Sequence, residues 1–102
     1  MQPIIENNKL KIAEICKDLN IKTLHVFGSA TTNRFNKDSD IDFLLSFPEN
    51  ISIEQYTDNY FELHYKLREL LNREIDITTE RSLSNPYFIE SVNETKQLLY
   101  EA

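Results

Sequence analysis

The residues with the clearest chemical potential in this 102-residue chain are two aspartates separated by one position, Asp40 and Asp42. A run of β-branched, aliphatic and aromatic residues follows them to Phe47, which predicts a strand. In a strand, residues two apart share a face, and their Cα atoms lie roughly 6.6 Å apart. Two carboxylates at this spacing can converge on one cation or bridge two ions about 3.5–4 Å apart. The pair therefore predicts a metal site on one face of a strand whose other face is apolar.

Gly28 and Ser29 form a second feature, separated from Asp40 by ten residues. Gly28 is the only glycine in the chain, and it follows the apolar run 24–27, where a strand is expected to end. Without a Cβ, Gly28 allows a tight turn or the close approach of a ligand to the backbone. Ser29 offers a hydroxyl and an N–H at a possible helix start, which suits phosphate oxygens. A plain turn is the alternative, and the nearby acids favour the phosphate site.

A third acid, Asp76, lies in a later strand expected over 74–78. Its neighbours Ile75 and Ile77 face one way, and Asp76 faces the other. Burying a lone carboxylate is costly, and a cation would offset that cost. Glu74 shares the face of Asp76 but lies at the end of the strand, where we expect it to be solvated.

The order strand, Gly28-Ser29, ten residues, Asp40-Ile41-Asp42, then an acid in an apolar strand resembles the DNA polymerase β-type nucleotidyltransferases. The similarity is specifically to their minimal single-domain branch in bacteria and archaea, and it runs from about Leu24 to the end of the chain. It implies an α+β domain in which a small mixed sheet has helices packed on one face. Many members carry arginines and a second glycine after Gly-Ser, where this chain has residues 30–33, Ala-Thr-Thr-Asn, before Arg34.

The resemblance also implies a reaction, transfer of a nucleoside monophosphate from a triphosphate to a hydroxyl, with ATP as the expected donor. The implied metal ligands and catalytic residues, with two Mg²⁺ ions, are Asp40, Asp42 and Asp76. The implied nucleotide contacts are Gly28, Ser29 and Arg34. From the residues alone, Arg34 is equally well a solvated loop charge.

Minimal members of this branch are often paired with a small helical HEPN-type toxin and act as its antitoxin, in some cases by adding AMP to a toxin tyrosine. The resemblance therefore implies a toxin partner and a heteromeric complex. A second hypothesis is a catalytically weak or inactive domain that neutralises its partner by binding alone. The altered residues after Ser29 favour that hypothesis, and the presence of all three acids favours the enzyme.

Composition limits the alternatives. The length fits one domain over residues 1–102, and any further domain is expected to come from a partner. Cys16 is the only cysteine, and neither a signal peptide nor a membrane-spanning run is visible, so a reducing cytoplasm is expected. The net charge of −6 argues against nucleic acid as the main partner.

Periodicity predicts the remaining elements, with Asn85 and Pro86 as the start of the last helix and Leu99 among its apolar residues. An additional short strand or hairpin is compatible with this pattern. The expected elements are helices over 3–19, 51–71 and from 86 onward, and strands over 23–27, 41–47 and 74–78.

Aromatic residues widen the apolar stripe of the helix expected over 51–71 beyond what one small sheet needs to cover. Core packing is one interpretation, and a partner-binding surface that includes some of Tyr56, Tyr60, Phe61 and Tyr65 is the other. His25 has no ligand-spaced partner nearby, and we expect a structural histidine rather than a site residue.

Overall fold

The computed structural model describes residues 1–102 and contains a four-stranded mixed sheet with the strand order β3-β2-β1-β4. The strands are β1 (Thr23–Phe27), β2 (Ile41–Ser46), β3 (Ile75–Thr79) and β4 (Gln97–Glu101). β1 pairs antiparallel with both β2 and β4, and β2 pairs parallel with β3. The α+β class and the mixed sheet are therefore confirmed.

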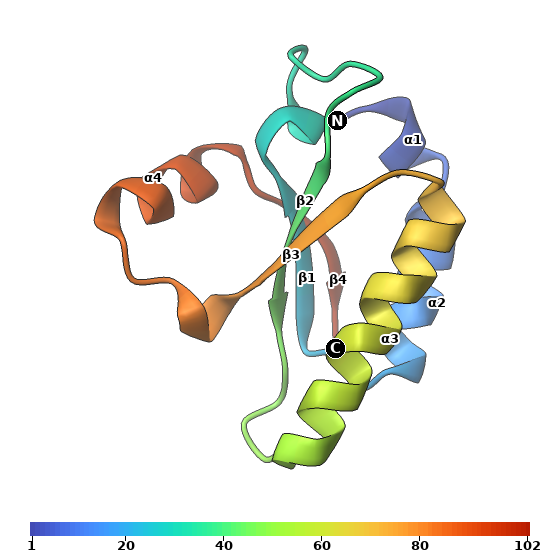
Figure 1. The fold of residues 1–102 in the computed structure, drawn as a ribbon, viewed down its shortest axis with the longest axis vertical. Helices are drawn as coiled ribbons and strands as arrows, with labels where there is room; N and C mark the ends of the chain where they lie inside the picture. The colour runs from blue at the N-terminus through green and yellow to red at the C-terminus, as the bar shows by residue number, and fades with distance from the viewer.

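Three helices cover one face of the sheet, which Figure 1 shows from its β3 edge. They are α1 (Pro3–Glu6), α2 (Lys9–Asp18) and α3 (Ile53–Leu71). The core between these layers joins alternate strand residues such as Val26 and Phe43 to helix residues such as Ile12 and Leu67, all at 0% exposure. Cys16 lies in the same core, and burial raises the pKa of its thiol to about 12, which fits a packing role rather than a reactive thiol.

The fourth helix, α4 (Pro86–Thr95), lies on the opposite face of the sheet (Figure 1). Its Val92 packs against Phe27 and Leu44, whose side chains point away from the main core. The expected one-sided layering thus holds for α1 to α3 but not for α4. No helix in the structure combines the length and the apolar composition needed to cross a membrane.

Near both ends of the chain, the observed secondary structure differs from the expected helices. The helix predicted over 3–19 is interrupted between α1 and α2, where the Asn8 side-chain amide donates to the Ile4 carbonyl at 2.8 Å. Short polar side chains compete in this way with helical hydrogen bonds. The last helix stops at Thr95, and Leu99 belongs to β4, where pairing with β1 buries it in the main core.

Ser52 caps the start of α3, where its hydroxyl accepts the Gln55 N–H at 3.1 Å, and Asn72 caps the end in the left-handed conformation. Only the C-terminal half of its predicted apolar stripe is buried, through Leu63, Leu67 and Leu71. In the N-terminal half, Ile53 is exposed, whereas Tyr56 and Tyr60 are half-buried and Tyr60 packs against the main core.

Candidate active site

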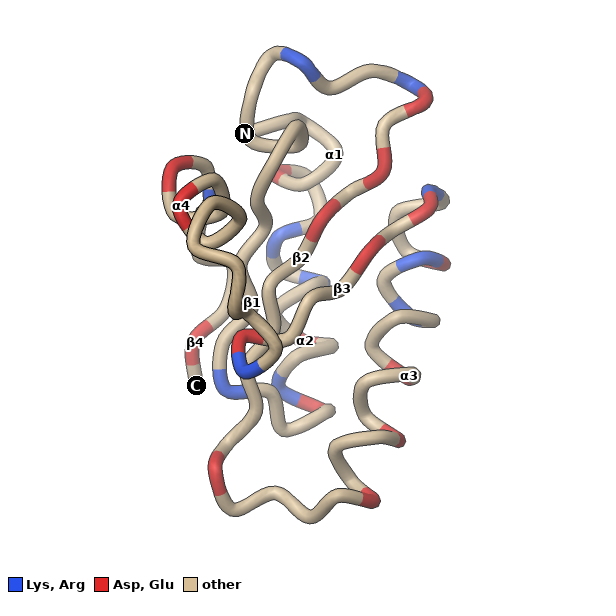
Figure 2. Tube along the Cα trace, turned by 60° about the vertical axis from the view of Figure 1, so that its left-hand side comes forward, with Lys and Arg blue, Asp and Glu red and all other residues tan.

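The three predicted acids lie at one end of the sheet, where β2 and β3 begin. Asp42 pairs in register with Phe27 on one side and with Asp76 on the other. Paired residues of neighbouring strands project to the same face, so Asp42 and Asp76 both lie on the α4 face. Asp40 is exposed and directly precedes β2. Figure 2 shows the acidic segments of β2 and β3 next to each other.

These acids create a local excess of negative charge. Burial raises the pKa of Asp42 to about 6, and the charges of Asp76 and Asp40 add to the shift. The only ion pair in the structure joins Arg68 to Glu74 at 2.8 Å, so no Lys or Arg side chain forms an ion pair with the three acids. A bound cation would relieve this repulsion.

The donor chemistry of this end of the sheet fits Mg²⁺, which prefers carboxylate oxygens and keeps several of its waters. No group of three or more His, Cys, Asp or Glu side chains is arranged as a metal-binding cluster in the structure. The structure thus pairs Asp42 with Asp76 but does not gather all three acids into a metal-binding cluster. Magnesium sites built from one or two carboxylates together with substrate phosphates do not require such a cluster.

Gly28 lies directly against Asp42. It has a φ of +74°, and a Cβ built on it would lie 2.9 Å from the Asp42 Oδ2 atom. Its N–H donates to the Thr95 hydroxyl at 2.9 Å, which ties the turn to the end of α4. Both a left-handed conformation and a close approach thus require glycine here.

Ser29 lies in η1 (Gly28–Thr31), a four-residue 3₁₀ turn. The Thr31 and Thr32 hydroxyls donate to the carbonyls of Gly28 and Ser29, at 2.8 and 3.2 Å, and help close the turn. The expected helix start is therefore a single turn with little macrodipole. Any phosphate contact here depends on individual N–H and hydroxyl groups.

Arg34 is exposed, and its guanidinium has no ion-pair or hydrogen-bond partner in the structure; only its backbone N–H is bonded, to the Thr32 hydroxyl. The structure does not bring the Arg34 side chain together with the three acids.

Arg73, which lies between the helix expected over 51–71 and the strand expected over 74–78, holds the loop before β2. It donates to the carbonyls of Asn36 and Ser39, both at 2.6 Å, and its guanidinium lies 4.2 Å from the centre of the Phe35 ring. These partners are 34 or more positions away along the chain, so no local pattern indicates the contact. Arg73 thereby positions the segment that leads into Asp40.

His25 lies away from the acids, as expected for a structural histidine. It pairs with Leu44 in mid-sheet and lines a polar groove with Lys22, Arg81 and Lys96. Burial, followed by the charge of Lys96, lowers its pKa.

Stability should depend on pH through Asp42. Because folding raises its pKa from 3.8 to about 6, the metal-free native state is destabilised relative to the unfolded chain as pH rises from about 4 to about 6. Asp42→Asn should remove this cost and add about 1–2 kcal/mol to the free energy of unfolding at pH 7, allowing for screening of a half-buried group, with no gain below pH 4. Urea unfolding of both proteins in the presence of a chelator measures the difference. A variant no more stable than wild type at pH 7 would contradict the electrostatic assignment.

Known proteins resemble this chain in sequence and in fold. A model of the nucleotidyltransferase domain matches residues 9–99. The chain is 32% identical over 94 residues to "Putative protein adenylyltransferase MJ0126" of Methanocaldococcus jannaschii, an alignment that covers 92% of this chain and 89% of the relative. A solved "putative minimal nucleotidyltransferase" superposes with a TM-score of 0.72 at 26% identity over 95% of both chains. A chain of a toxin–antitoxin complex with AMP-PNP shares the fold, with a TM-score of 0.71 at 23% identity over 93% of this chain and 74% of the other. The protein therefore belongs to the nucleotidyltransferase domain family and is a nucleotidyltransferase.

Proposed function

We propose that this protein transfers AMP from ATP to a tyrosine hydroxyl of a small helical HEPN-type toxin and so acts as its antitoxin in the cytoplasm. The observation that carries the proposal is the in-register pairing of Asp42 with Asp76 beside Gly28. The names of relatives support the acceptor class, since the M. jannaschii protein is named as a protein adenylyltransferase. A further structural neighbour comes from a tri-AMPylated Shewanella oneidensis HEPN toxin in complex with an MNT antitoxin, with a TM-score of 0.65 at 21% identity.

The three acids share one role in this proposal, and Asp76 has a second. Asp40, Asp42 and Asp76 would hold two Mg²⁺ ions, which when bound compensate the triphosphate charge and acidify the acceptor hydroxyl. Asp76 is exposed and therefore free to take the acceptor proton. The acceptor oxygen then bonds to the α-phosphorus of ATP, the bond to the β-phosphate oxygen breaks, and pyrophosphate leaves.

The nucleotide contacts in this proposal come from the turn after β1. Gly28 leaves room for Asp42, and Ser29 offers its N–H and hydroxyl to phosphate oxygens. Arg34, with no internal partner, is free to approach the triphosphate when the nucleotide binds.

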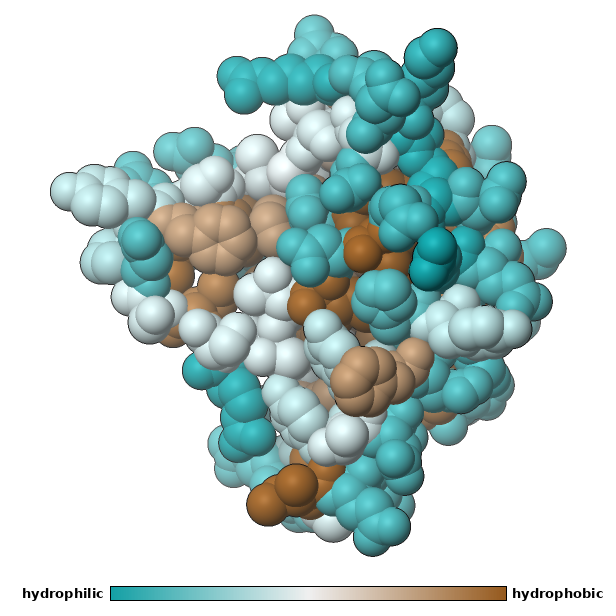
Figure 3. Space-filling view, in the orientation of Figure 1, coloured by the Kyte–Doolittle hydropathy of each residue, from teal (hydrophilic) through white to brown (hydrophobic).

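The proposed partner surface is on α3. Phe61 and Tyr65 are 65% and 63% exposed and lie one helical turn apart, whereas Tyr56 and Tyr60 are half-buried. Figure 3 shows apolar side chains interrupting the hydrophilic surface on the side where β3 and α3 lie. Exposed aromatic residues in one region favour a protein interface.

Metal binding should be measurable as stabilisation. Mg²⁺ or Mn²⁺ should raise the melting temperature, and ATP should raise it further, because a ligand at 100 times its Kd adds about 2.7 kcal/mol to the native state. For a domain of this size, that corresponds to roughly 10 °C or more. The double variant Asp40→Asn with Asp42→Asn should lose the response. An undiminished metal response in that variant would remove both residues from the site.

The function itself is tested by incubating the protein with its toxin, Mg²⁺ and labelled ATP, followed by intact-mass measurement of the toxin. We expect the toxin to gain one or more AMP units at tyrosine.

The second candidate function, neutralisation of the toxin by binding alone, is favoured by the missing basic residues at 30–33. It predicts a toxin that is inhibited without any gain in mass.

A further inference from the structure

Asp40 is the one acid of the candidate site that the sheet does not hold. It is exposed and directly precedes β2, whereas Asp42 and Asp76 pair in register within the sheet. Its side chain forms no hydrogen bond or ion pair within the protein. The position of Asp40 therefore depends on the residues on either side of it.

Both neighbours of Asp40 are hydrogen-bonded to the segment that begins β3. The Ile41 N–H donates to the Glu74 carbonyl at 3.2 Å. On the other side, the Arg73 guanidinium donates to the Ser39 carbonyl at 2.6 Å. Asp40 thus lies between two bonds to consecutive residues of one segment.

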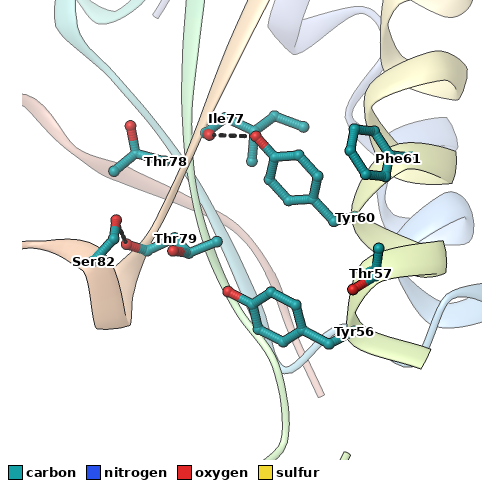
Figure 4. Close-up of a pocket in the computed structure, with 8 residues that line it drawn as sticks. All are labelled: Tyr56, Thr57, Tyr60, Phe61, Ile77, Thr78, Thr79 and Ser82. Carbon is teal, nitrogen blue, oxygen red and sulfur yellow. Dashed lines mark hydrogen bonds between the residues drawn. The ribbon is translucent and has the colours of Figure 1, made fainter. Parts of the chain in front are cut away.

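β3, which carries Asp76, is a fixed support for these contacts. It pairs with β2 on one side. On its outer side, the Tyr60 hydroxyl of α3 donates to the Ile77 carbonyl at 3.0 Å, as Figure 4 shows. A side chain at the start of β3 can therefore set where the loop before β2 lies relative to this strand.

The loop presents prearranged partners to the guanidinium. Ser39 N–H donates to the Asn36 carbonyl at 3.1 Å, Asn36 N–H to the Ser39 hydroxyl at 3.1 Å, and Asp38 N–H to the Asn36 side chain at 2.8 Å. These bonds close the turn over 36–39, whose first and last carbonyls both accept from Arg73. The Phe35 ring stacks on the guanidinium, with 4.2 Å between the Arg73 Cζ atom and the ring centre. A planar, delocalised cation suits this combination of ring and carbonyls.

The charge of Arg73 by itself would work against a cation site. A positive charge near the acids lowers their affinity for a metal ion. Arg73 forms no ion pair with any of them, and its two hydrogen bonds are to neutral carbonyl groups. These contacts indicate a contribution through loop geometry rather than through charge.

We propose that Arg73 is a positioning residue that directs Asp40 toward the cation held by Asp42 and Asp76. The inference rests on the proposed function, in which the three acids share the metal ions. Replacing a residue that orients metal ligands without binding the metal typically costs about 10–100-fold in metal affinity. A residue that only protects the loop from unfolding would leave the affinity of the folded protein unchanged.

The test compares Mn²⁺ binding by wild type, Arg73→Met and Arg68→Met, measured by water-proton relaxation below the melting temperature of each protein. Arg73→Met removes the charge and the donors but keeps an unbranched side chain, and it should raise the Kd for Mn²⁺ about 10–100-fold. Arg68→Met removes the same charge from an exposed residue that pairs with Glu74, and it should leave the Kd unchanged or slightly lower. Hydrogen exchange of the Ile41 amide in the metal-free protein should be faster in Arg73→Met alone.

A Kd for Arg73→Met equal to or lower than that of wild type would overturn the proposal, because loss of a positive charge alone predicts a lower Kd. If Arg73→Met does not fold, Phe35→Leu decides. This variant keeps the charge and the donors of Arg73, and loss of the ring contact should raise the Kd about two- to fivefold. An unchanged Kd in Phe35→Leu would then overturn the proposal.

The transfer assay reads the proposed function separately. Weaker Mn²⁺ binding by Arg73→Met, without AMP transfer from wild type to the toxin, would retain the positioning role and reject the antitoxin enzyme. AMP transfer by wild type, together with an unchanged Kd in Arg73→Met, would retain the enzyme and reject the positioning role.

Discussion

Asp76→Asn is expected to lower AMP transfer by at least about 10²-fold while leaving the protein folded, as expected for loss of a general base. The Asp76 side chain is exposed and forms no hydrogen bond or ion pair within the protein, so the nearly isosteric amide has no internal partner to disrupt. The strand is held from its other face by the buried Ile75 and Ile77. Transfer of label from ATP to the toxin, with circular dichroism as the folding check, measures both effects.

The matched control is Asp38→Asn, which removes the same charge from an exposed position in the loop before β2. It should retain transfer near the wild-type rate. Equal transfer by Asp76→Asn and Asp38→Asn would exclude Asp76 as the base. Toxin that is inhibited by both variants, and by wild type, without gaining mass would identify a binding protein instead.

Gly28→Ala should impair both stability and transfer. At a φ of +74°, a residue with a Cβ costs about 1–2 kcal/mol, which lowers the melting temperature by roughly 4–15 °C in a domain of this size. The new methyl group would also lie 2.9 Å from the Asp42 Oδ2 atom, so the carboxylate must move. A displacement on the order of 1 Å can cost about 10²-fold in rate. Urea unfolding and single-turnover transfer measure the two effects.

Asn72→Ala is the control that distinguishes the effect of backbone strain from the effect of a displaced Asp42 carboxylate. Asn72 also has a positive φ, 52°, but it caps the end of α3, where its N–H donates to the Arg68 carbonyl. Its substitution should therefore cost similar stability and leave the transfer rate of the folded protein unchanged. If both variants transfer AMP equally well once folded, the contact between Gly28 and Asp42 does not matter for the reaction.

Local patterns in the sequence determined much of this fold. In the strand expected over 23–27, successive side chains alternate between the two faces, so that Leu24 and Val26 lie in the main core and Phe27 on the other face. The start of α4 was equally local, because the Asn85 side chain accepts the N–H groups of Tyr87 and Phe88 at 2.9 and 3.3 Å. Such features were predictable because period-two alternation and helix capping involve residues only a few positions apart.

The acids of the candidate site were also identifiable from the sequence, since their type and spacing are local. Asp42 lies beside Asp76 because β2 pairs parallel with β3. These two strands are separated in the sequence by the whole of α3. That register, and the 2.9 Å approach of the Gly28 position to Asp42, are properties of the assembled sheet. The roles of these residues as metal ligands stay predictions until the metal and transfer experiments are done.

Tertiary structure alone decided the remaining features. The segment around Leu99 is a strand because the edge of β1 offers unpaired backbone groups that a helix could not satisfy. α4 covers the second face because Phe27 and Leu44 leave an apolar surface there, and Arg73 reaches back to carbonyls more than 30 positions away. Each of these contacts joins residues that are distant along the chain. Their free energy is gained only when the sheet has formed, and so no short stretch of sequence contains the signal for them.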